Sequence, residues 1–323
     1  MGRVVNGKWE IGGRIPDPDG RFVRQTTHFR DAITADGSSG FAPEPGRYHL
    51  YVSWACPWAH RTLILRKLKG LEAAISLSVV DHHMGELGWA FREGPGNIPD
   101  PIHHAAYLHQ VYIAADPDYT GRASVPVLWD KARGTIVNNE SREIIRMFDT
   151  ACDAMAGHPE VNFCPPGLQE RIDETIDAIY EPINNGVYKS GFAVTQAAYE
   201  EAVTTLFDAL AHWEAVLGRQ RYLCGEVLTE ADWCLFTTLI RFDLVYYGHF
   251  KCNLNHIWDF PHLWNYLKEL YQHPGVAETC NLAHMKAHYY GSHETVNPTG
   301  VIPLGPRVSF DAPHDRASRR YAG

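Results

Sequence analysis

Cys56 is the residue whose position most clearly suggests chemistry. It stands in the segment SWACPW (53–58), after a β-prone run at 48–52 and before a helical pattern. Pro57 suits the first position of a helix, so Cys56 would lie near the helix N-cap. There the helix dipole and unpaired backbone N–H groups lower the pKa of a thiol, and Arg61 one turn later adds positive potential. The pattern predicts a reactive thiolate, with a buried inert cysteine as the alternative.

The residue three positions after Cys56 is Ala59, so no second thiol stands where a CxxC pair would place one. A protein with both thiols resolves its own mixed disulfide. A mixed disulfide of Cys56 would instead have to be released by an outside thiol. This requirement points to glutathione or a similar small thiol as co-substrate.

A second candidate for ligand binding is Val125-Pro126, which opens the β-prone run VPVLWD (125–130). A cis bond here would present the backbone N–H and C=O of Val125 to an extended peptide. Few X-Pro bonds are cis, so the sequence favours the trans form.

Glu140-Ser141 is a third candidate, at the start of a helical pattern that continues to Phe148. A carboxylate beside a hydroxyl at a helix N-terminus offers an acceptor for an ammonium group and donors for a carboxylate. The alternative is a simple N-cap, with Ser141 as the capping residue.

Metal and phosphate chemistry have weaker support. His284 and His288 have the i, i+4 spacing of a metal-binding pair, but no HExxH or further ligand motif accompanies them, so we predict no metal site. No phosphate loop of the GxxxxGK[ST] type occurs. An odd number of cysteines without any CxxC pair favours a reduced cytoplasmic protein. The seven cysteines are at positions 56, 152, 164, 224, 234, 252 and 280.

The elements that must position Cys56 form a predicted β-α-β unit. A strand at 48–52 leads into a helix that ends near Gly70, and a second strand follows at 75–80. Crossovers of this kind usually join parallel strands.

Strands at 125–130 and 135–137, joined by a turn-prone connection, predict an antiparallel hairpin before the helix that starts at Ser141. The segment 82–120 interrupts the regular pattern and indicates a long functional loop or insertion. Residues 1–45 predict an irregular arm, because they are rich in Gly, Pro and Asp.

The second half of the chain has helical periodicity. Apolar residues recur every three or four positions over 168–183 and over 199–217, as amphipathic helices require. Thr229 and Asp232 form a variant capping box before a strongly apolar helix. Residues 291–323 return to Pro, Gly and charge. The chain is therefore predicted to be an α/β unit with mixed strands followed by an all-helical unit.

Length and composition limit the function classes. The 323 residues suffice for two domains and additional segments, and 45% apolar with 21% charged residues is typical of a globular protein. A net charge of −9 argues against general binding of nucleic acid or anionic membranes. No apolar run approaches the about 18 residues of a membrane span. The N-terminal residues lack the apolar run of a secretory signal.

Three of these motifs together resemble the glutathione-binding domain of glutathione transferases that have a catalytic cysteine: CPWA (56–59), VPVLWD (125–130) and NNES (138–141). Longer segments are similar to the Xi class, the glutathionyl-hydroquinone reductases, and the resemblance covers roughly residues 45–310. These segments are GWAFREG (88–94), YTGRASVPVLWD (119–130), NNGVYKSGFA (184–193), RFDLVYYGHFKCN (241–253) and HYYGSHETVNPTGVIPLGP (288–306).

The resemblance implies the glutathione transferase fold, with a thioredoxin-like N-terminal domain and a C-terminal helical bundle. The implied organisation is an arm at 1–45, a glutathione-binding domain at 46–155 with the insertion 82–120, an all-helical substrate domain at 165–290 and an extended tail at 291–323.

The resemblance also implies roles for site residues. Cys56 would be the nucleophile, Val125 would pair with the cysteinyl backbone of glutathione, and Glu140 and Ser141 would bind its γ-glutamyl end. The complete set implied to hold glutathione is Trp89, Arg122, Val125, Pro126, Glu140 and Ser141.

The aromatic substrate would lie against Tyr188, Tyr246 and Tyr289, one of which supplies a proton, because a tyrosine offers both a flat apolar face and a hydroxyl. Tyr247 and Tyr290 adjoin two of these positions and are alternatives, and any one of them could be an ordinary core tyrosine.

The implied activity is the glutathione-dependent reduction of glutathionyl-hydroquinones to hydroquinones through a Cys56–glutathione mixed disulfide, with release of oxidised glutathione. The expected protein is a cytoplasmic homodimer that uses glutathione as co-substrate and no metal, and that binds neither nucleic acid nor membrane. Two alternatives are a transferase that conjugates glutathione or cleaves aryl ethers or thioethers, and a non-catalytic interaction module with the same fold.

Overall fold

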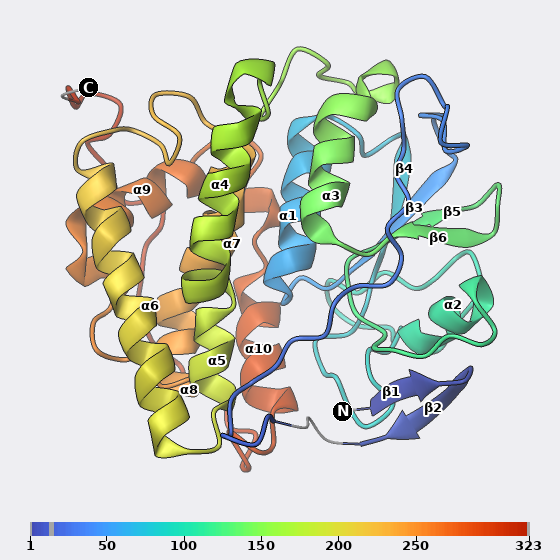
Figure 1. Cartoon of the computed structure of the whole chain (residues 1–323), viewed down its shortest axis with the longest axis horizontal. Helices are drawn as coiled ribbons and strands as arrows, with labels where there is room; N and C mark the ends of the chain where they lie inside the picture. Colours follow the sequence, from blue (N-terminus) through green and yellow to red (C-terminus); the bar gives the residue numbers. More distant parts are fainter. Residues whose placement is uncertain (1, 13–15, 322–323) are drawn as a thin grey trace. The chain divides into compact units, whose positions relative to one another are not determined.

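The chain divides into two units in the computed structural model, which describes residues 2–12 and 16–321 (Figure 1). The first unit contains the strands and the second is helical. The first comprises 2–12, 24–162 and 279–288, and the second comprises 16–23, 163–278 and 289–321.

The sheet of the first unit has four strands: β3 (Tyr48–Val52), β4 (Ile75–Val79), β5 (Val127–Asp130) and β6 (Thr135–Asn138). Their order is β4-β3-β5-β6. β3 pairs in parallel with β4 and antiparallel with β5, which pairs antiparallel with β6. All five residues of β3 are buried, so the strand that leads toward Cys56 lies in the core.

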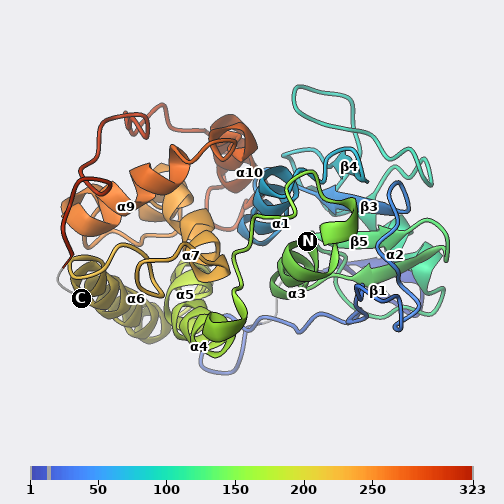
Figure 2. The same cartoon turned by 90° about the horizontal axis from the view of Figure 1, so that it is seen from above.

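Three helices accompany this sheet: α1 (Pro57–Leu68), α2 (Leu108–Ala115) and α3 (Ser141–Arg146). Figure 2 shows α1 and α3 together on one side of the strands and α2 on the other. The end of α1 is set by Gly70, whose φ of 62° is in the left-handed region that glycine adopts without strain. The N–H of Leu71 then donates to the carbonyl of Arg66 at 2.8 Å, which closes the helix terminus.

The arm differs from its prediction. Instead of being wholly irregular, it begins with an antiparallel hairpin of β1 (Gly2–Val5) and β2 (Lys8–Ile11). Asn6 and Gly7 form the turn with φ of 48° and 72°. An Asn-Gly pair suits a two-residue hairpin turn because both central residues need positive φ. That dipeptide was the sequence signal for the hairpin.

The segment 82–120, predicted to be a long loop or an insertion, contains the helix α2. The helix predicted to run from Ser141 to Phe148 starts as expected but has Glu140 as its N-cap, and it passes after Arg146 into a π-helical turn. Because glutamate is not among the favoured N-cap residues, the sequence pointed to Ser141.

The second unit contains the helices α4 (Gln169–Ile179), α5 (Gly186–Phe192), α6 (Gln196–Leu217), α7 (Glu230–Arg241), α8 (Tyr247–His249), α9 (Pro261–Tyr271) and the last four residues of α10 (Leu282–Ser292). Every residue of α7 is buried. Its predicted capping box is confirmed, since the N–H of Thr229 donates to Asp232 Oδ2 at 2.8 Å.

The tail contains no helix or strand between residues 293 and 321. It nevertheless packs on α9, because the buried side chain of Arg316 forms an ion pair with Glu269 at 2.9 Å. No helix in the described part of the chain combines the length and the apolar character that crossing a bilayer requires.

Candidate active site

Cys56 lies at the N-cap of α1, as predicted, with Pro57 in the first turn. Its backbone is extended (φ −76°, ψ 122°), and its carbonyl accepts from the N–H of His60 at 3.0 Å, which begins the helical hydrogen-bond pattern. The thiol is partly exposed and donates to the carbonyl of Val125 at 3.5 Å. The sulfur therefore lies at the positive end of the helix dipole, where a thiolate is stabilised.

The bond between Val125 and Pro126 is cis, whereas the sequence favoured trans. The isomer is set by tertiary contacts that a sequence does not reveal. Val125 stands two residues before β5, and its carbonyl oxygen lies beside the thiol of Cys56. The structure thus brings together the two motifs that the sequence placed 69 residues apart.

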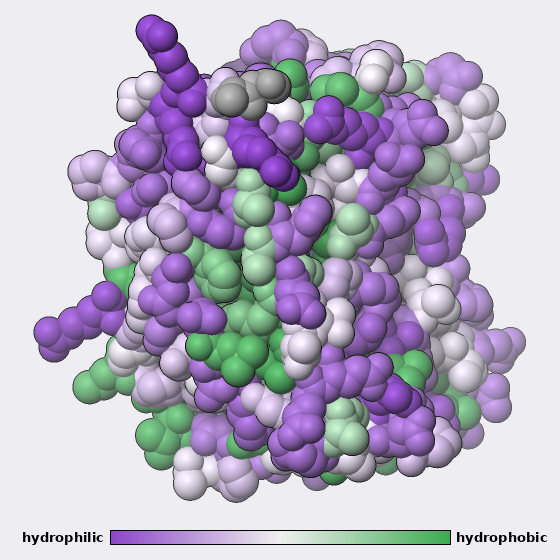
Figure 3. All heavy atoms as spheres, turned by 60° about the vertical axis from the view of Figure 1, so that its left-hand side comes forward, coloured by the Kyte–Doolittle hydropathy of each residue, from purple (hydrophilic) through white to green (hydrophobic). Residues whose placement is uncertain are grey.

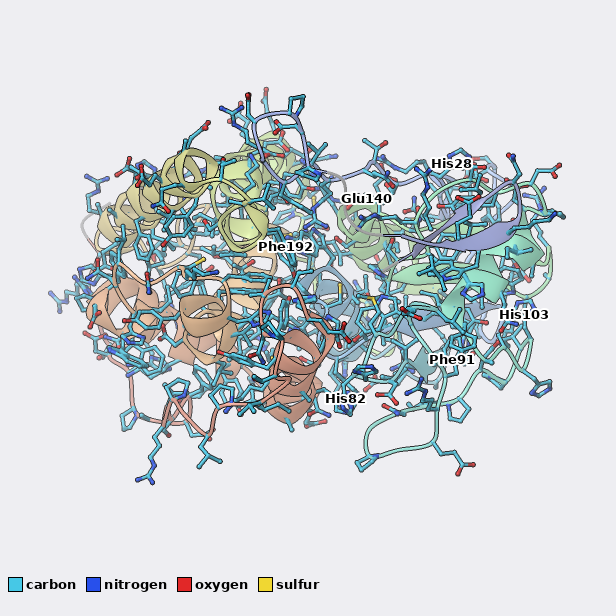
Figure 4. All side chains as sticks on the ribbon, turned by 90° about the horizontal axis from the view of Figure 1, so that it is seen from below. His28, His82, Phe91, His103, Glu140 and Phe192 are labelled. Atoms are coloured by element: carbon cyan, nitrogen blue, oxygen red, sulfur yellow. The ribbon has the colours of Figure 1, made fainter. Side chains whose placement is uncertain are left out.

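Glu140 and Ser141 form the N-terminus of α3, where Figure 4 labels Glu140. The Glu140 carboxylate accepts from the N–H of Arg142 and from the hydroxyl of Thr27, both at 3.3 Å. Ser141 donates to Glu140 Oε1 at 3.4 Å. The hydroxyl of Ser141 also accepts from the buried guanidinium of Arg61 at 3.3 Å. This contact joins α1 to the start of α3, and the expected effect of Arg61 on Cys56 stays a prediction.

Trp89 belongs to the insertion and is 8% exposed. Its indole stacks on the imidazole of His288, with ring centroids 4.7 Å apart and an interplanar angle of 26°. The backbone carbonyl of Trp89 accepts from the N–H of Leu108 at 2.9 Å, at the beginning of α2. Both contacts fix the position of this side chain within the first unit.

Arg122 is half-buried, and its pKa is lowered by burial and by repulsion from Arg24. The Arg24 guanidinium lies 3.9 Å from the centre of the Trp58 ring, in the first turn of α1. The two guanidinium groups are close enough to repel each other, and such a pair forms a favourable environment for an anion. Arg24 was not predicted, because it stands in an arm without periodicity and reaches the site by a long-range contact.

Tyr188, Tyr246 and Tyr289 meet in the second unit and are all buried. The hydroxyl of Tyr289 is hydrogen-bonded to that of Tyr188 and lies 3.1 Å from that of Tyr246. Burial raises the pKa of Tyr246 and Tyr289 well above the usual value, so both hydroxyls retain their protons. Figure 4 labels Phe192, whose ring lies 6.1 Å from that of Tyr188.

The two alternative tyrosines lie elsewhere. Tyr247 stacks on His256 at a centroid distance of 3.6 Å. Tyr290 packs against His249 at 4.9 Å and is only half-buried. Neither residue has a hydrogen bond to the hydroxyl of Tyr289 within the described residues. The structure thus brings Tyr188, Tyr246 and Tyr289 into one hydrogen-bonded cluster without Tyr247 or Tyr290.

The site residues predicted from sequence therefore form two groups. Cys56, Trp89, Arg122, Val125, Pro126, Glu140 and Ser141 belong to the first unit, and the three clustered tyrosines belong to the second. α10 is divided between the two units, because His288 belongs to the first unit and Tyr289, the next residue, to the second. Over the described residues, no set of three or more His, Cys, Asp or Glu side chains is arranged to hold a metal ion.

Comparison with family models gives two matches. Residues 55–151 match the glutathione S-transferase N-terminal domain, and residues 196–269 match the glutathione S-transferase C-terminal domain. The first match includes Cys56, Val125 and Glu140, and the second includes α6 and α7.

Similar proteins cover nearly the whole chain. A glutathionyl-hydroquinone reductase of Escherichia coli, YqjG, is 51% identical over 99% of each chain. A glutathionyl-hydroquinone reductase of Sphingobium chlorophenolicum, PcpF, is 52% identical over 95% of this chain and 96% of its own.

Solved structures agree with these sequence matches. An Xi class glutathione transferase from Natrialba magadii has a TM-score of 0.93 and 53% identity, covering 98% of this chain and 97% of its own. The glutathione-bound structure of YqjG has a TM-score of 0.90 and 50% identity, covering 98% and 99%.

The chain belongs to the glutathione S-transferase family. Within that family it is a member of the Xi class, whose solved structures it resembles over almost its full length. The fold predicted from the sequence, a thioredoxin-like domain followed by a helical bundle, is confirmed.

Proposed function

We propose that this protein is a glutathionyl-hydroquinone reductase, which uses glutathione to convert glutathionyl-hydroquinones to hydroquinones. The observation that carries the proposal is Cys56 at the N-cap of α1, without a second cysteine at Ala59, in a chain about half identical to two reductases of that name. A thiolate at a helix N-terminus is a suitable nucleophile, and the lack of a neighbouring thiol explains the need for glutathione.

The reaction begins when the Cys56 thiolate attacks the sulfur of the substrate's glutathionyl group. A sulfur–sulfur bond forms and the aromatic carbon–sulfur bond breaks, with its electron pair passing to the ring. The ring takes up a proton and leaves as hydroquinone. A second glutathione thiolate then attacks the glutathionyl sulfur of the mixed disulfide, which yields oxidised glutathione and restores the Cys56 thiolate.

The first unit supplies the groups that would hold glutathione. The backbone of Val125 pairs with the cysteinyl part, and the Glu140 carboxylate accepts from the γ-glutamyl ammonium group. Arg122 and Arg24 bind the glycyl carboxylate, which relieves the repulsion between the two guanidinium groups. Trp89 provides an apolar wall of the glutathione site, and Ser141 donates to the γ-glutamyl carboxylate. Pro126 contacts glutathione beside Val125.

The tyrosine cluster would bind the aromatic ring and supply its proton. Because Tyr289 is hydrogen-bonded to both Tyr188 and Tyr246, charge that develops on the ring is shared across three hydroxyls. Tyr289 follows His288 directly in α10, and His288 is in contact with Trp89.

We propose that the protein acts in the cytoplasm and that it forms a homodimer, as the family resemblance implies. Exposed apolar side chains are available for a dimer interface. The side chains of Val194 and Leu304, for example, have relative solvent exposures of 67% and 101%. Apolar side chains also gather near the middle of the otherwise mostly hydrophilic face in Figure 3. Sedimentation of the purified protein at two concentrations tests the dimer, and a monomer at both would contradict it.

Product analysis tests the activity. The enzyme is supplied with a glutathionyl-hydroquinone and glutathione, and both hydroquinone and oxidised glutathione are measured by chromatography. One oxidised glutathione should appear for each hydroquinone. A conjugating transferase would instead form a new thioether without oxidised glutathione, and a non-catalytic module would form neither product. Cys280→Ser, which changes the other partly exposed cysteine, is the matched control and should retain full activity.

A further inference from the structure

The beginning of the insertion is fastened to the first two turns of α10 by two histidines. His284 Nε2 lies 2.6 Å from the carbonyl oxygen of Pro95, and His288 Nδ1 lies 2.8 Å from the carbonyl oxygen of His82. A carbonyl oxygen only accepts a hydrogen bond, so His284 Nε2 and His288 Nδ1 must each carry a hydrogen. These contacts fix the tautomer of each neutral imidazole. Figure 4 labels His82 beside α10. The two histidines are four residues apart and therefore share one face of the helix.

The same part of the insertion is also tied to the residues just before Cys56. The indole N–H of Trp54 donates to the carbonyl of Gly96 at 2.8 Å. Gly96 has a φ of 80°, and a Cβ there would come within 3.0 Å of Asn281 Nδ2 and 3.1 Å of His284 Nε2. The loop thus approaches α10 as closely as a glycine permits, which makes the histidine contacts part of a tight packing.

His288 makes one contact that His284 does not. Its imidazole is stacked on the indole of Trp89, while its Nδ1 holds the backbone of His82 seven residues earlier in the same loop. Residues 80–107 contain no helix or regular strand, but the backbone around Trp89 is held by hydrogen bonds from the N–H of Leu108 to the carbonyl of Trp89 at 2.9 Å and from the N–H of Asp81 to the carbonyl of Ala90 at 2.8 Å. These bonds hold the main chain, and the stacked imidazole restrains the plane of the indole side chain.

We propose that His288 is a positioning residue for glutathione binding, which holds the Trp89 indole in place by stacking on it and by fastening the loop at His82. The proposal rests on the proposed role of Trp89 as a wall of the glutathione site. In this role His288 acts through Trp89 and not by its own contact with glutathione. The i, i+4 spacing of His284 and His288, which is also that of a metal-binding pair, is thus explained by their hydrogen bonds to two points of the same loop.

A matched control exists in the same unit. The imidazole of His109 stacks on the indole of Trp9, with centroids 4.5 Å apart and an angle of 20°, and its Nδ1 lies 3.1 Å from the carbonyl oxygen of Leu87. His109 therefore has the same two types of contact with a tryptophan and with the insertion, but it stacks on a different indole. Its replacement measures the effect of loosening the loop without loosening Trp89.

The experiment measures the dissociation constant of glutathione by calorimetry for the full-length protein and its variants. We expect His288→Ala to weaken binding about tenfold and His288→Phe, which keeps a flat ring against Trp89, only about twofold. His109→Ala should stay within about twofold of the parent protein. At saturating glutathione kcat should be nearly unchanged in all three, because the histidine acts on binding.

A double-mutant cycle with Trp89→Ala separates positioning from a general structural effect. If His288 acts through Trp89, His288→Ala should add nothing further in the Trp89→Ala background. An equal loss of affinity in both backgrounds, or an equal loss in His109→Ala, would overturn the inference. If Trp89→Ala weakens binding and the His288 variants do not, the inference alone fails. If Trp89→Ala has no effect, the proposed role of Trp89 fails and the inference with it, whereas product analysis still tests the activity.

Discussion

The sulfur of Cys56 lies 3.5 Å from the carbonyl oxygen of Val125. One residue is the N-cap of α1 and the other precedes β5, so two segments of the sheet domain meet where the thiol is presented. A glutathione paired with the backbone of Val125 would have its cysteinyl sulfur near that of Cys56. This relationship connects the sequence motifs with the proposed thiol chemistry.

Glu140→Gln should weaken glutathione binding about tenfold, because the amide lacks the charge that attracts the γ-glutamyl ammonium group. The amide oxygen can still accept from Arg142, so the cap of α3 is retained and the free energy of unfolding should change by less than about 1 kcal/mol. Calorimetric titration and thermal unfolding measure the two effects. The assignment of Glu140 to the γ-glutamyl ammonium group would be contradicted if the affinity for glutathione were unchanged. It would also be contradicted if the variant lost affinity only because it was partly unfolded.

Arg24→Ala should weaken binding of glutathione about fivefold, because it removes one of the two guanidinium groups proposed to bind the glycyl carboxylate. The glycyl ethyl ester of glutathione lacks that charge and should bind the variant and the parent protein about equally. Titration with both ligands makes the comparison. If affinity for the ester falls as much as affinity for glutathione, Arg24 acts through Trp58 or the fold and not on the carboxylate.

Tyr289→Phe should lower kcat about 100-fold and Tyr246→Phe about tenfold, because Tyr289 is the hydroxyl shared by the other two. Tyr246→Phe leaves the hydrogen bond between Tyr188 and Tyr289 in place. Steady-state rates at saturating glutathione measure the difference. An equal or larger loss in Tyr246→Phe would assign the central role to Tyr246 instead.

The stability of the protein should fall on mild acidification through His49. This buried side chain in β3 has hydroxyls at both ring nitrogens, Ser76 at 2.7 Å and Ser78 at 2.8 Å, and burial lowers its pKa from 6.5 to about 4. Between these two pKa values the unfolded chain binds a proton at His49 and the folded chain does not. The contribution of His49 to the free energy of unfolding is therefore complete above pH 6.5 and is lost as the pH falls toward 4.

For His49 alone, the loss between pH 7 and pH 5.5 should be about 1 kcal/mol. Urea unfolding of the parent protein and of His49→Gln at both pH values isolates it, since glutamine at position 49 does not titrate while every other group is unchanged. The parent should lose more stability than the variant. Equal losses would show that His49 is not the titrating group.

The sequence predicted the parts of the site that local signals determine. The β-prone run of β3 and Pro57 at the start of α1 placed Cys56 at its N-cap, and Thr229 with Asp232 marked the start of α7. These signals act within one turn of helix or one strand, so they survive in the folded protein.

The sequence did not reveal the long-range contacts. Arg24 reaches Trp58 from an arm without periodicity, and His288 reaches Trp89 across almost 200 residues. Neither contact leaves a pattern in its own segment. The cis bond at Pro126 and the capping by Glu140 likewise depend on surroundings that only the folded chain provides.

The central claim is that Cys56 accepts the glutathionyl group. The most direct measurement mixes the enzyme with an equimolar glutathionyl-hydroquinone in the absence of free glutathione and locates the adduct by mass spectrometry of peptides. One glutathionyl group should be found on Cys56, with an equal amount of hydroquinone released, and Cys56→Ser should form neither. Hydroquinone released without an adduct on Cys56, or an adduct found only on another cysteine, would contradict the claim.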